Sequence, residues 1–157
     1  MVTVTGGKWT TYRAMAEDVL DACADRSLLE RRVKGVTTHL KLVGSSVPEA
    51  QIRSICMPPG LHSYGDEQAA VQAMPGADRL LCEGLTEGMV RFAARYEYAR
   101  TVEDVLARRW RTLFLDARLA ATLAPAVAAL LQQETGSDPQ LAAFVALAAQ
   151  YLQLPTR

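Results

Sequence analysis

The chain has 157 residues, 50% of them hydrophobic, and its 17 basic residues are balanced by 17 acidic residues. This length allows one domain with a buried core, and the zero net charge provides no field that would attract a nucleic acid. The longest apolar stretches, such as residues 119–131, fall short of the ~20 residues that a membrane-spanning helix needs. Because the amino terminus also lacks a secretory signal, we expect a cytoplasmic location.

The three cysteines and two histidines form no pattern typical of a metal site or a disulfide framework. Cys23, Cys56 and Cys82 are widely spaced and odd in number, and His39 and His62 are not part of an H-x-x-x-H pair. Zinc sites and disulfide frameworks show characteristic ligand or cysteine spacings. The sequence therefore predicts reduced thiols and no metal site.

The chain is expected to open with a strand, a tight turn and a helix. Residues 2–5 have β-branched side chains and are followed by Gly6-Gly7, which predicts a short strand ending in a turn. Apolar residues then recur at helical spacing over residues 12–23, and the hydroxyl of Thr10 or Thr11 can cap the first turn. A lone strand cannot satisfy its own backbone hydrogen bonds, so we expect residues 2–5 to pair with strands outside this sequence.

The middle of the chain is expected to be irregular and then helical. Glycines and prolines interrupt residues 35–60, which we interpret as a connecting segment with at most a short helical or extended piece at 52–57. Residues 64–74 and 86–98 are predicted to be short helices. The inner face of the second helix is assigned to Met89, Phe92, Ala93 and Tyr96.

The sequence around residue 101 predicts the start of another helix. Thr101 stands three residues ahead of Asp104, a spacing at which each side chain can satisfy a free backbone N–H of the other. The expected buried stripe of this helix consists of Val102, Val105, Leu106, Trp110 and Leu113. At this spacing Trp110 is more typical of a core residue than of a cofactor stack, and we expect the same of Tyr96 and Tyr98.

Two further helices are expected over residues 116–134 and 139–152. Pro125 must kink or restart the first helix, and Asp138 is expected to cap the second. The residues assigned to the inner faces are Leu119, Leu123, Ala126 and Leu130 in the first helix, and Leu141, Phe144, Val145, Ala148 and Leu152 in the second. The predicted fold class is all-α: residues 35–157 form a domain of about five to six helices, preceded by a strand-turn-helix stub at residues 1–34.

Residues 6–13 (GGKWTTYR) are the segment most typical of a binding site. Two glycines at a strand-to-helix corner let the backbone approach a ligand, and the N–H groups of the next turn attract an electron-rich oxygen. The simpler interpretation is a structural turn before a capped helix, and spacing alone does not exclude it. The charges between Arg91 and Arg118 alternate in sign, which favours a solvated surface over a binding site.

Two parts of the chain resemble the FAD-dependent, quinone-linked glycerol-3-phosphate dehydrogenases. Residues 6–13 are similar to the last strand and helix of the flavin domain of that family. Four further segments resemble the carboxy-terminal helical domain of the family: residues 95–97 (RYE), 99–101 (ART), 103–109 (EDVLARR) and 114–118 (FLDAR). The two resemblances occur in the family's order along the chain, and the second is the more specific.

The resemblance implies a parent enzyme that binds FAD, oxidises sn-glycerol 3-phosphate to dihydroxyacetone phosphate, and passes electrons to quinone while bound peripherally to the cytoplasmic membrane. It assigns Lys8 a catalytic position beside flavin and substrate, and it places Gly6, Gly7, Trp9 and Thr10 against the cofactor. The family's G-x-G-x-x-G fingerprint and its other substrate-binding arginines are absent from this chain. We therefore expect FAD not to remain bound to the chain alone, and the chain alone to be inactive.

The expected partners are the amino-terminal FAD and substrate domain of the same parent, with a homodimer possible, and no nucleic acid. The chain departs from the family at Gly88, where a larger residue is usual, and at residues 134–137, which replace a more apolar stretch. A related enzyme uses oxygen as acceptor, and these residues do not separate the two. The alternative is an independent helical module that binds a partner protein and catalyses nothing; a G-x-G-x-x-G upstream of Met1 would favour the enzyme.

Overall fold

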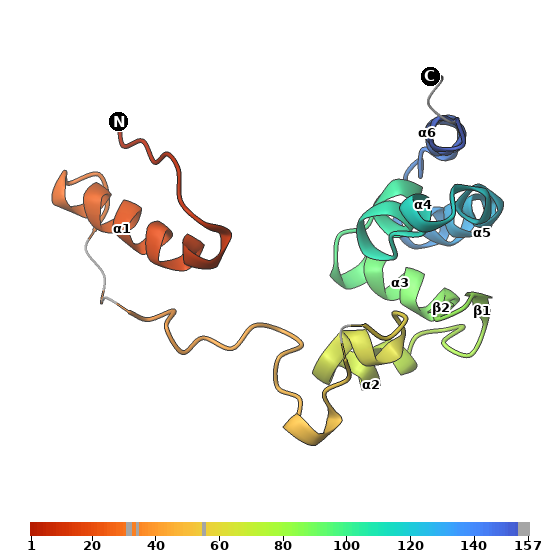
Figure 1. Cartoon of the computed structure of the whole chain (residues 1–157), viewed down its shortest axis with the longest axis horizontal. Coiled ribbons are helices and arrows are strands. Elements are labelled where there is room, and N and C mark those ends of the chain that lie inside the picture. Colours follow the sequence, from red (N-terminus) through yellow and green to blue (C-terminus); the bar gives the residue numbers. More distant parts are fainter. Residues whose placement is uncertain (31–32, 34, 55, 154–157) are drawn as a thin grey trace. The chain divides into compact units, whose positions relative to one another are not determined.

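The computed structural model describes residues 1–30, 33, 35–54 and 56–153, and the chain divides into two compact units, Met1–Leu42 and Val43–Arg157 (Figure 1). The expected domain boundary at residue 34 lies outside the described residues. Apart from one short hairpin, the regular elements of the described residues are helices, which confirms the all-α fold class. Within the described part of the chain, no helix combines the length and the apolar character needed to cross a bilayer.

The first unit contains one long helix. A single 3-10 turn, η1 (Trp9–Thr11), leads into α1 (Tyr12–Asp25), and none of the residues of α1 is buried. The strand expected over residues 2–5 is not formed. A strand requires a neighbour to accept and donate its backbone hydrogen bonds, and the described part of the chain offers none here.

The second unit begins with short helical turns. These are η2 (Glu49–Gln51), η3 (Leu61–Glu67) and α2 (Gln68–Gln72). The helix predicted over residues 64–74 is therefore partly 3-10 in character, and it ends before Pro75-Gly76 as expected. No helix or strand is assigned to the described residues of the piece at 52–57, and residue 55 lies outside them.

A two-stranded hairpin follows that is not expected from the sequence. Strand β1 (Leu80–Cys82) pairs antiparallel with β2 (Leu85–Thr86), and Gly84 in the connecting turn has a φ of +79°. Strands of three and two residues are too short to show an alternating pattern of apolar residues. The hairpin leads directly into the next helix, because the Thr86 hydroxyl accepts a hydrogen bond from the Met89 N–H at 3.3 Å.

Helix α3 (Glu87–Tyr96) matches the expected helix at 86–98 and buries Met89, Phe92 and Ala93. The assignment of Tyr96 and Tyr98 to the core is wrong, because these side chains are 64% and 76% exposed. Trp110, in contrast, is 9% exposed and belongs to the core as predicted.

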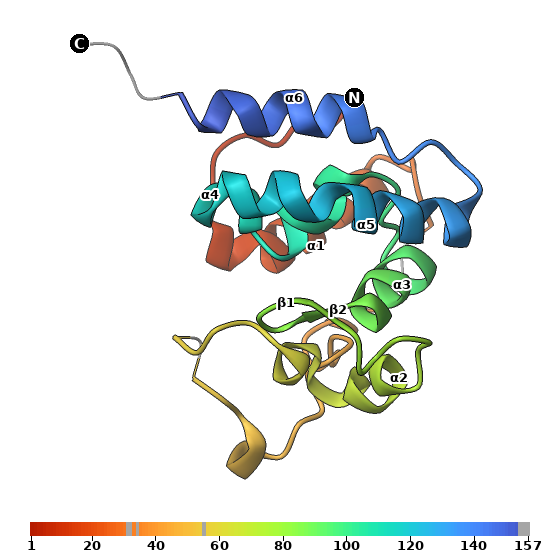
Figure 2. The ribbon, with the colours of Figure 1, turned by 90° about the vertical axis from the view of Figure 1, so that its right-hand side faces the viewer.

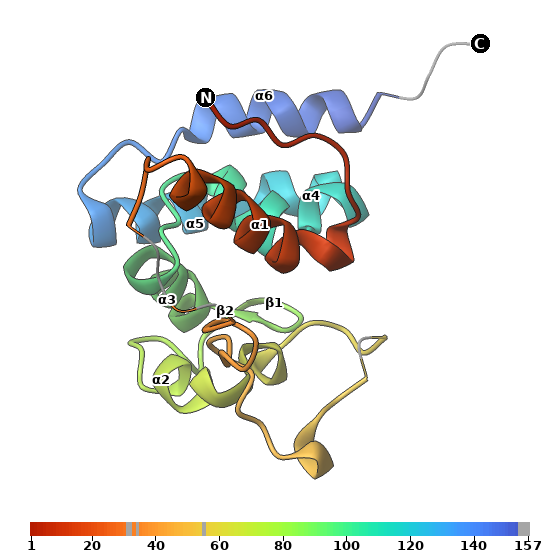
Figure 3. The ribbon, with the colours of Figure 1, turned by 90° about the vertical axis from the view of Figure 1, so that its left-hand side faces the viewer.

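The remaining helices form most of the core. They are η4, a π-helix (Asp104–Arg109), α4 (Thr112–Leu115), α5 (Ala117–Thr135) and α6 (Leu141–Tyr151). Figures 2 and 3 show α5 lying between α6 and α3, with α4 near the end of α6 that leads to the carboxy terminus. Asp116 caps α5 through the Leu119 N–H at 3.0 Å, and the helix continues through Pro125 without restarting.

The inner faces of α5 and α6 differ in part from the prediction. Leu119, Ala126, Val145 and Leu152 are exposed. The buried residues of α5 are Ala117, Ala120, Leu123, Ala124, Val127, Ala128, Leu130 and Leu131. Because α5 has neighbours on several sides, its buried surface is wider than a single stripe and includes positions that one helical period does not select. Helix α6 begins at Leu141 with Gln140 at its N-cap, so the expected cap by Asp138 is wrong. The Asp138 carboxylate instead accepts from the Gln140 N–H at 2.9 Å, before the helix.

Gly88 lies where two parts of the backbone approach closely. Its N–H donates to the Gly76 carbonyl at 3.0 Å, and a Cβ at this position would lie 2.7 Å from the Ala77 Cα. A side chain has no room there unless the backbone moves. The absence of a larger residue at this position therefore follows from the packing of α3 against the turn before the hairpin.

An ion-pair cluster joins α3 to the end of α5. The Glu134 carboxylate accepts from Arg91 Nη1 at 2.5 Å and from Arg95 Nε at 2.6 Å, and its side chain is only 9% exposed. The hydrogen bond from Arg95 and then the contact with Arg91 hold the pKa of Glu134 below its ordinary 4.5, against the opposing effect of burial. The carboxylate thus fixes two arginines of one helix to another helix 39 or more positions away along the chain.

We predict that Gly88→Ala destabilises the chain by about 1–3 kcal/mol, because the added methyl group overlaps the backbone at Ala77. In an open helical position the same change would stabilise by about 1 kcal/mol. Urea denaturation measures the difference. Gly60→Ala is the matched control, since its Cβ would have 3.5 Å to the nearest atom, and its effect should stay within ~0.5 kcal/mol. Unchanged stability of Gly88→Ala would contradict the close approach.

We predict that Glu134→Gln lowers the free energy of unfolding by about 2 kcal/mol at neutral pH, because Arg91 and Arg95 lose their shared carboxylate. Folding lowers the pKa of Glu134 below its ordinary 4.5. The ionised carboxylate therefore stabilises the fold fully at pH values above its pKa in the unfolded state, and this stabilisation is lost as the pH falls through its lower pKa in the folded state. The difference between wild type and variant should therefore shrink in acid. Glu83→Gln, at an exposed carboxylate, is the control, and a pH-independent difference would refute the assignment.

Candidate functional site

The strongest candidate site on sequence grounds, residues 6–13, forms a tight turn followed by the start of α1. Gly6 and Gly7 have φ values of +75° and +104°, a region that residues with a side chain rarely adopt. A Cβ on Gly7 would also overlap the side chain of Met15, which lies on the first turn of α1. The two glycines are thus required by the backbone conformation, and Gly7 additionally by close packing.

Lys8 and Thr11 fix the chain after this turn. The Thr11 hydroxyl donates to the Lys8 carbonyl at 3.0 Å and accepts from the Lys8 N–H at 3.4 Å. This differs from the expected cap, because the hydroxyl holds the residue before η1 and forms no cap hydrogen bond to α1 itself. Lys8 is exposed, and Trp9 is 88% exposed with its ring centroid 5.7 Å from that of Tyr12.

An open cleft of about 450 Å³ lies between residues 2–5 and one face of α1. Of the five residues assigned to the site from the sequence, only Gly7 lines this cleft, while Gly6, Lys8, Trp9 and Thr10 lie outside its lining. The lining from η1 and α1 consists of Thr11, Met15, Asp18, Val19 and Ala22. Asp18 is a polar group of this lining that was not assigned to the site from the sequence; it follows Thr11 by seven residues, a spacing that places two helical positions on one face.

The chemistry of residues 6–10 suits a ring system that carries electron-rich oxygens. The N–H groups of Trp9 and Thr10 open the helical turn, where the first N–H groups of a helix have no partner within it. A turn without side chains at residues 6 and 7 leaves space for a flat ligand, and the Lys8 ammonium adds a positive charge nearby. These donors fit a flavin in character. In the described part of the chain, no three possible metal ligands lie together.

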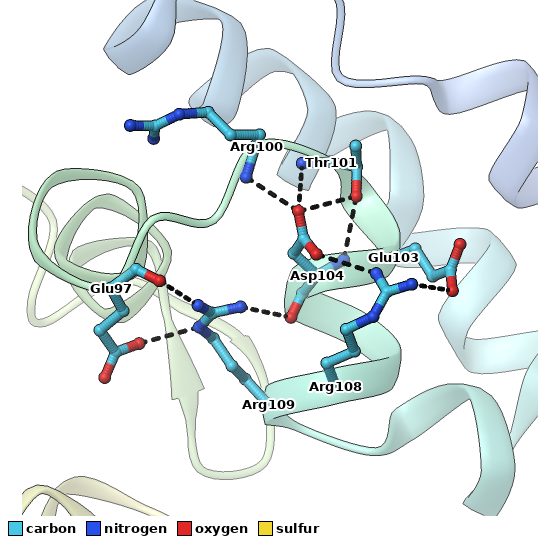
Figure 4. A network of polar contacts seen from close by, with 7 residues as sticks. All are labelled: Glu97, Arg100, Thr101, Glu103, Asp104, Arg108 and Arg109. Carbon is cyan, nitrogen blue, oxygen red and sulfur yellow. Dashed lines mark hydrogen bonds and ion pairs between the residues drawn. The ribbon is translucent and has the colours of Figure 1, made fainter. Parts of the chain in front are cut away.

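A second polar cluster lies between α3 and η4, and Figure 4 shows its residues. Asp104 Oδ2 accepts from the Thr101 N–H at 2.9 Å, while the Thr101 hydroxyl accepts from the Asp104 N–H at 3.2 Å, which confirms the predicted reciprocal cap. Burial alone would raise the pKa of Asp104, but hydrogen bonds from the Arg100 and Thr101 N–H groups and the Thr101 hydroxyl, with the charge of Arg108, lower it overall.

The arginines of this cluster are all engaged. Arg108 pairs with Asp104 at 2.8 Å and with Glu103 at 2.6 Å, and Arg109 Nε pairs with Glu97 at 2.9 Å. The Arg109 guanidinium also donates to the backbone carbonyls of Glu97 and Asp104, which ties the π-helix to the end of α3 (Figure 4). A solvated face describes Arg108, which is 55% exposed. It does not describe Arg109, whose partly buried bonds connect two elements.

Since every charge in this cluster is directed at another group of the same unit, the cluster provides rigidity and offers no free acid, base or nucleophile. The π-helix explains part of the arrangement. Its wider turns bring the Trp110 N–H to the Val105 carbonyl at 3.0 Å, and the Arg109 guanidinium donates to the Asp104 carbonyl at 2.9 Å.

Comparison with known proteins gives a consistent result. Residues 35–142 match the family model described as the C-terminal domain of alpha-glycerophosphate oxidase. The chain is 32% identical to the mitochondrial glycerol-3-phosphate dehydrogenase SDP6 of Arabidopsis thaliana over 85% of its length, and 29% identical to the human mitochondrial glycerol-3-phosphate dehydrogenase over 88%. A probable mitochondrial glycerol-3-phosphate dehydrogenase of Dictyostelium discoideum is 32% identical over 74%. No solved structure matches significantly.

The chain spans only about a quarter or less of the length of these relatives: the matches cover 26%, 22% and 20% of the three proteins, respectively. The relatives' names also correct one expectation. A cytoplasmic location is contradicted, because the matched dehydrogenases are mitochondrial proteins. That expectation rested on the absence of a leader at the first residue, and a chain that matches only part of its relatives gives no information about a leader.

The match over residues 35–142, together with 32% identity to a glycerol-3-phosphate dehydrogenase across 85% of the chain, shows that this protein belongs to the family of the C-terminal domain of alpha-glycerophosphate oxidase.

Proposed function

We propose that this chain is the carboxy-terminal part of an FAD-dependent glycerol-3-phosphate dehydrogenase, which oxidises sn-glycerol 3-phosphate to dihydroxyacetone phosphate and transfers the electrons to quinone. The observation that carries the proposal is the family match over residues 35–142, supported by relatives that are named glycerol-3-phosphate dehydrogenases. The same matches favour the enzyme over an independent interaction module.

In this proposal residues 1–34 belong to the flavin domain and residues 35–157 form the helical domain. The absence of any buried residue in α1 supports a partner for the first unit, because an amphipathic helix is stabilised mainly by packing its apolar face. The partner is the amino-terminal FAD and substrate domain of the parent. The cleft between α1 and residues 2–5 then becomes part of a larger interior.

The residues at the turn have separate roles. Gly6 and Gly7 allow the backbone to approach the cofactor, and the N–H groups of Trp9 and Thr10 bind its electron-rich oxygens. Lys8 places an ammonium beside cofactor and substrate, where it stabilises negative charge that develops during the reaction. FAD, when bound, supplies the capacity to accept a hydride from the substrate.

We predict that the purified 157-residue chain has no visible flavin absorption and does not oxidise glycerol 3-phosphate. The chain contains residues 6–13 but no G-x-G-x-x-G turn, so the pyrophosphate and most of the cofactor have no binding surface here. Absorption spectroscopy with added FAD and a dye-reduction assay test this. Stoichiometric yellow cofactor after purification would contradict it.

We predict that Lys8→Ala in the full-length parent lowers turnover by about a hundredfold, equivalent to ~3 kcal/mol, because it removes a charge that acts on the transition state. Stability should change by no more than ~0.5 kcal/mol, since Lys8 is exposed. Lys8→Arg should restore part of the activity, because a planar guanidinium distributes its charge differently. Steady-state kinetics and thermal melting measure both effects.

Lys41→Ala, at another exposed lysine of the first unit, is the control and should be silent. If turnover is unchanged in Lys8→Ala, Lys8 has no catalytic role and only the backbone contacts to the cofactor remain in the proposal.

A further inference from the structure

The second unit exposes an apolar patch formed by one end of α4 and the end of α6. The patch consists of Phe114, Leu115, Tyr151 and Leu152, which are 52%, 75%, 51% and 44% exposed. The same two helices bury Leu113 and Phe144 to within 2% exposure, so they are well packed on their inner side. The patch is therefore an additional apolar surface of packed helices and not a sign of a missing core.

The four side chains come from segments far apart in the sequence and lie together. The rings of Phe114 and Tyr151 pack edge to face with centroids 5.6 Å apart, and Leu115 and Leu152 directly follow them in the chain. Helices α4 and α6 contact each other, and Figures 2 and 3 show α4 beside the carboxy-terminal end of α6. A half-exposed aromatic side chain presents roughly 100 Å², so the patch amounts to on the order of 400 Å².

We propose that this α4–α6 patch is the surface against which the part of the parent polypeptide that precedes residue 1 docks; the proposal rests on the proposed function. Exposed apolar patches of roughly 300–600 Å² are commonly interaction sites. Aromatic residues in such a patch are typical of the centre of an interface.

The size of the patch favours this occupant over a second copy of the chain. A stable complex of two separate chains buries about 800 Å² on each partner, more than the patch provides, whereas interfaces between domains of one chain begin near 600 Å² in total. The matched relatives are several times longer than this chain, which covers 26% of one and 22% of another. A tethered partner docks at a high effective concentration and requires less surface.

The charges around the patch also favour a partner other than a second copy. Arg111 and Arg118 bracket its α4 portion, and among the described residues neither side chain forms an ion pair. Asp116 between them is engaged as the cap of α5. In a symmetric dimer these arginines of one copy would approach the same arginines of the other, whereas an acidic surface on another part of the parent would complement their charge.

Hydroxyl-radical footprinting of the flavin-loaded parent and of the 157-residue chain tests the proposal. We expect Phe114 and Tyr151 to be labelled several-fold more slowly in the parent, while Tyr96, which is 64% exposed on α3, serves as the reference and keeps its rate. Equal labelling of the patch in both proteins would overturn the proposal. A second outcome would also overturn the proposal. If the labelling rate of the patch in the 157-residue chain falls as the protein concentration rises, and sedimentation shows a dimer forming, a second copy of the chain covers the patch.

Leu115→Asp provides an independent measurement. Leu115 is 75% exposed, so the 157-residue variant should melt like the wild type, while in the parent the variant should release the carboxy-terminal unit to proteases several-fold faster. Arg53→Asp, an exposed charge change outside the patch, should leave the proteolysis rate unchanged. A parent that binds no FAD or does not oxidise glycerol 3-phosphate refutes the proposed function; an active, flavin-loaded parent with a fully labelled patch refutes only the docking surface.

Discussion

The second unit depends on the burial of α5, which packs against α3, α4 and α6 at once. Small side chains make this possible: Ala120, Ala124 and Ala128 are buried and allow neighbouring helices to approach closely, while Leu123 and Leu131 fill the larger spaces. Glu134 then fixes the far end of α5 to Arg91 and Arg95 of α3. The apolar contacts provide most of the stability, and the carboxylate selects one alignment of the two helices.

The same logic applies to the cluster around η4. Asp104 is bound to the first turn of its own helix and to Arg108, and Arg109 reaches back to Glu97. These charges form closed pairs, so they orient the π-helix and the end of α3 without leaving a group available for proton transfer or for binding an anion. This cluster of arginines and carboxylates thus holds helices of the second unit in place.

The two units differ in how complete they are. The second unit has a continuous core from Val71 to Ala148, whereas no residue of the long helix of the first unit is fully buried. The turn at Gly6 and Gly7 is nevertheless well defined, through positive φ values and the hydrogen bonds between Lys8 and Thr11. A well-defined turn beside a partly buried helix is consistent with the proposal that this segment obtains further contacts from another part of the parent polypeptide.

The sequence alone determined the helical fold class, the Thr101–Asp104 cap, the core position of Trp110 and the resemblance to the family. Local hydrogen bonds and helical periodicity depend on residues that are close together in the sequence. Only the tertiary structure decided the hairpin, the exposure of Tyr96 and Leu119, and the close backbone approach that requires glycine at residue 88. Each of these depends on which distant segment packs against a residue, and periodicity within one helix does not specify its neighbours. For the same reason residues 2–5 form no strand here: β-pairing requires a second strand, and the described part of this chain does not supply one.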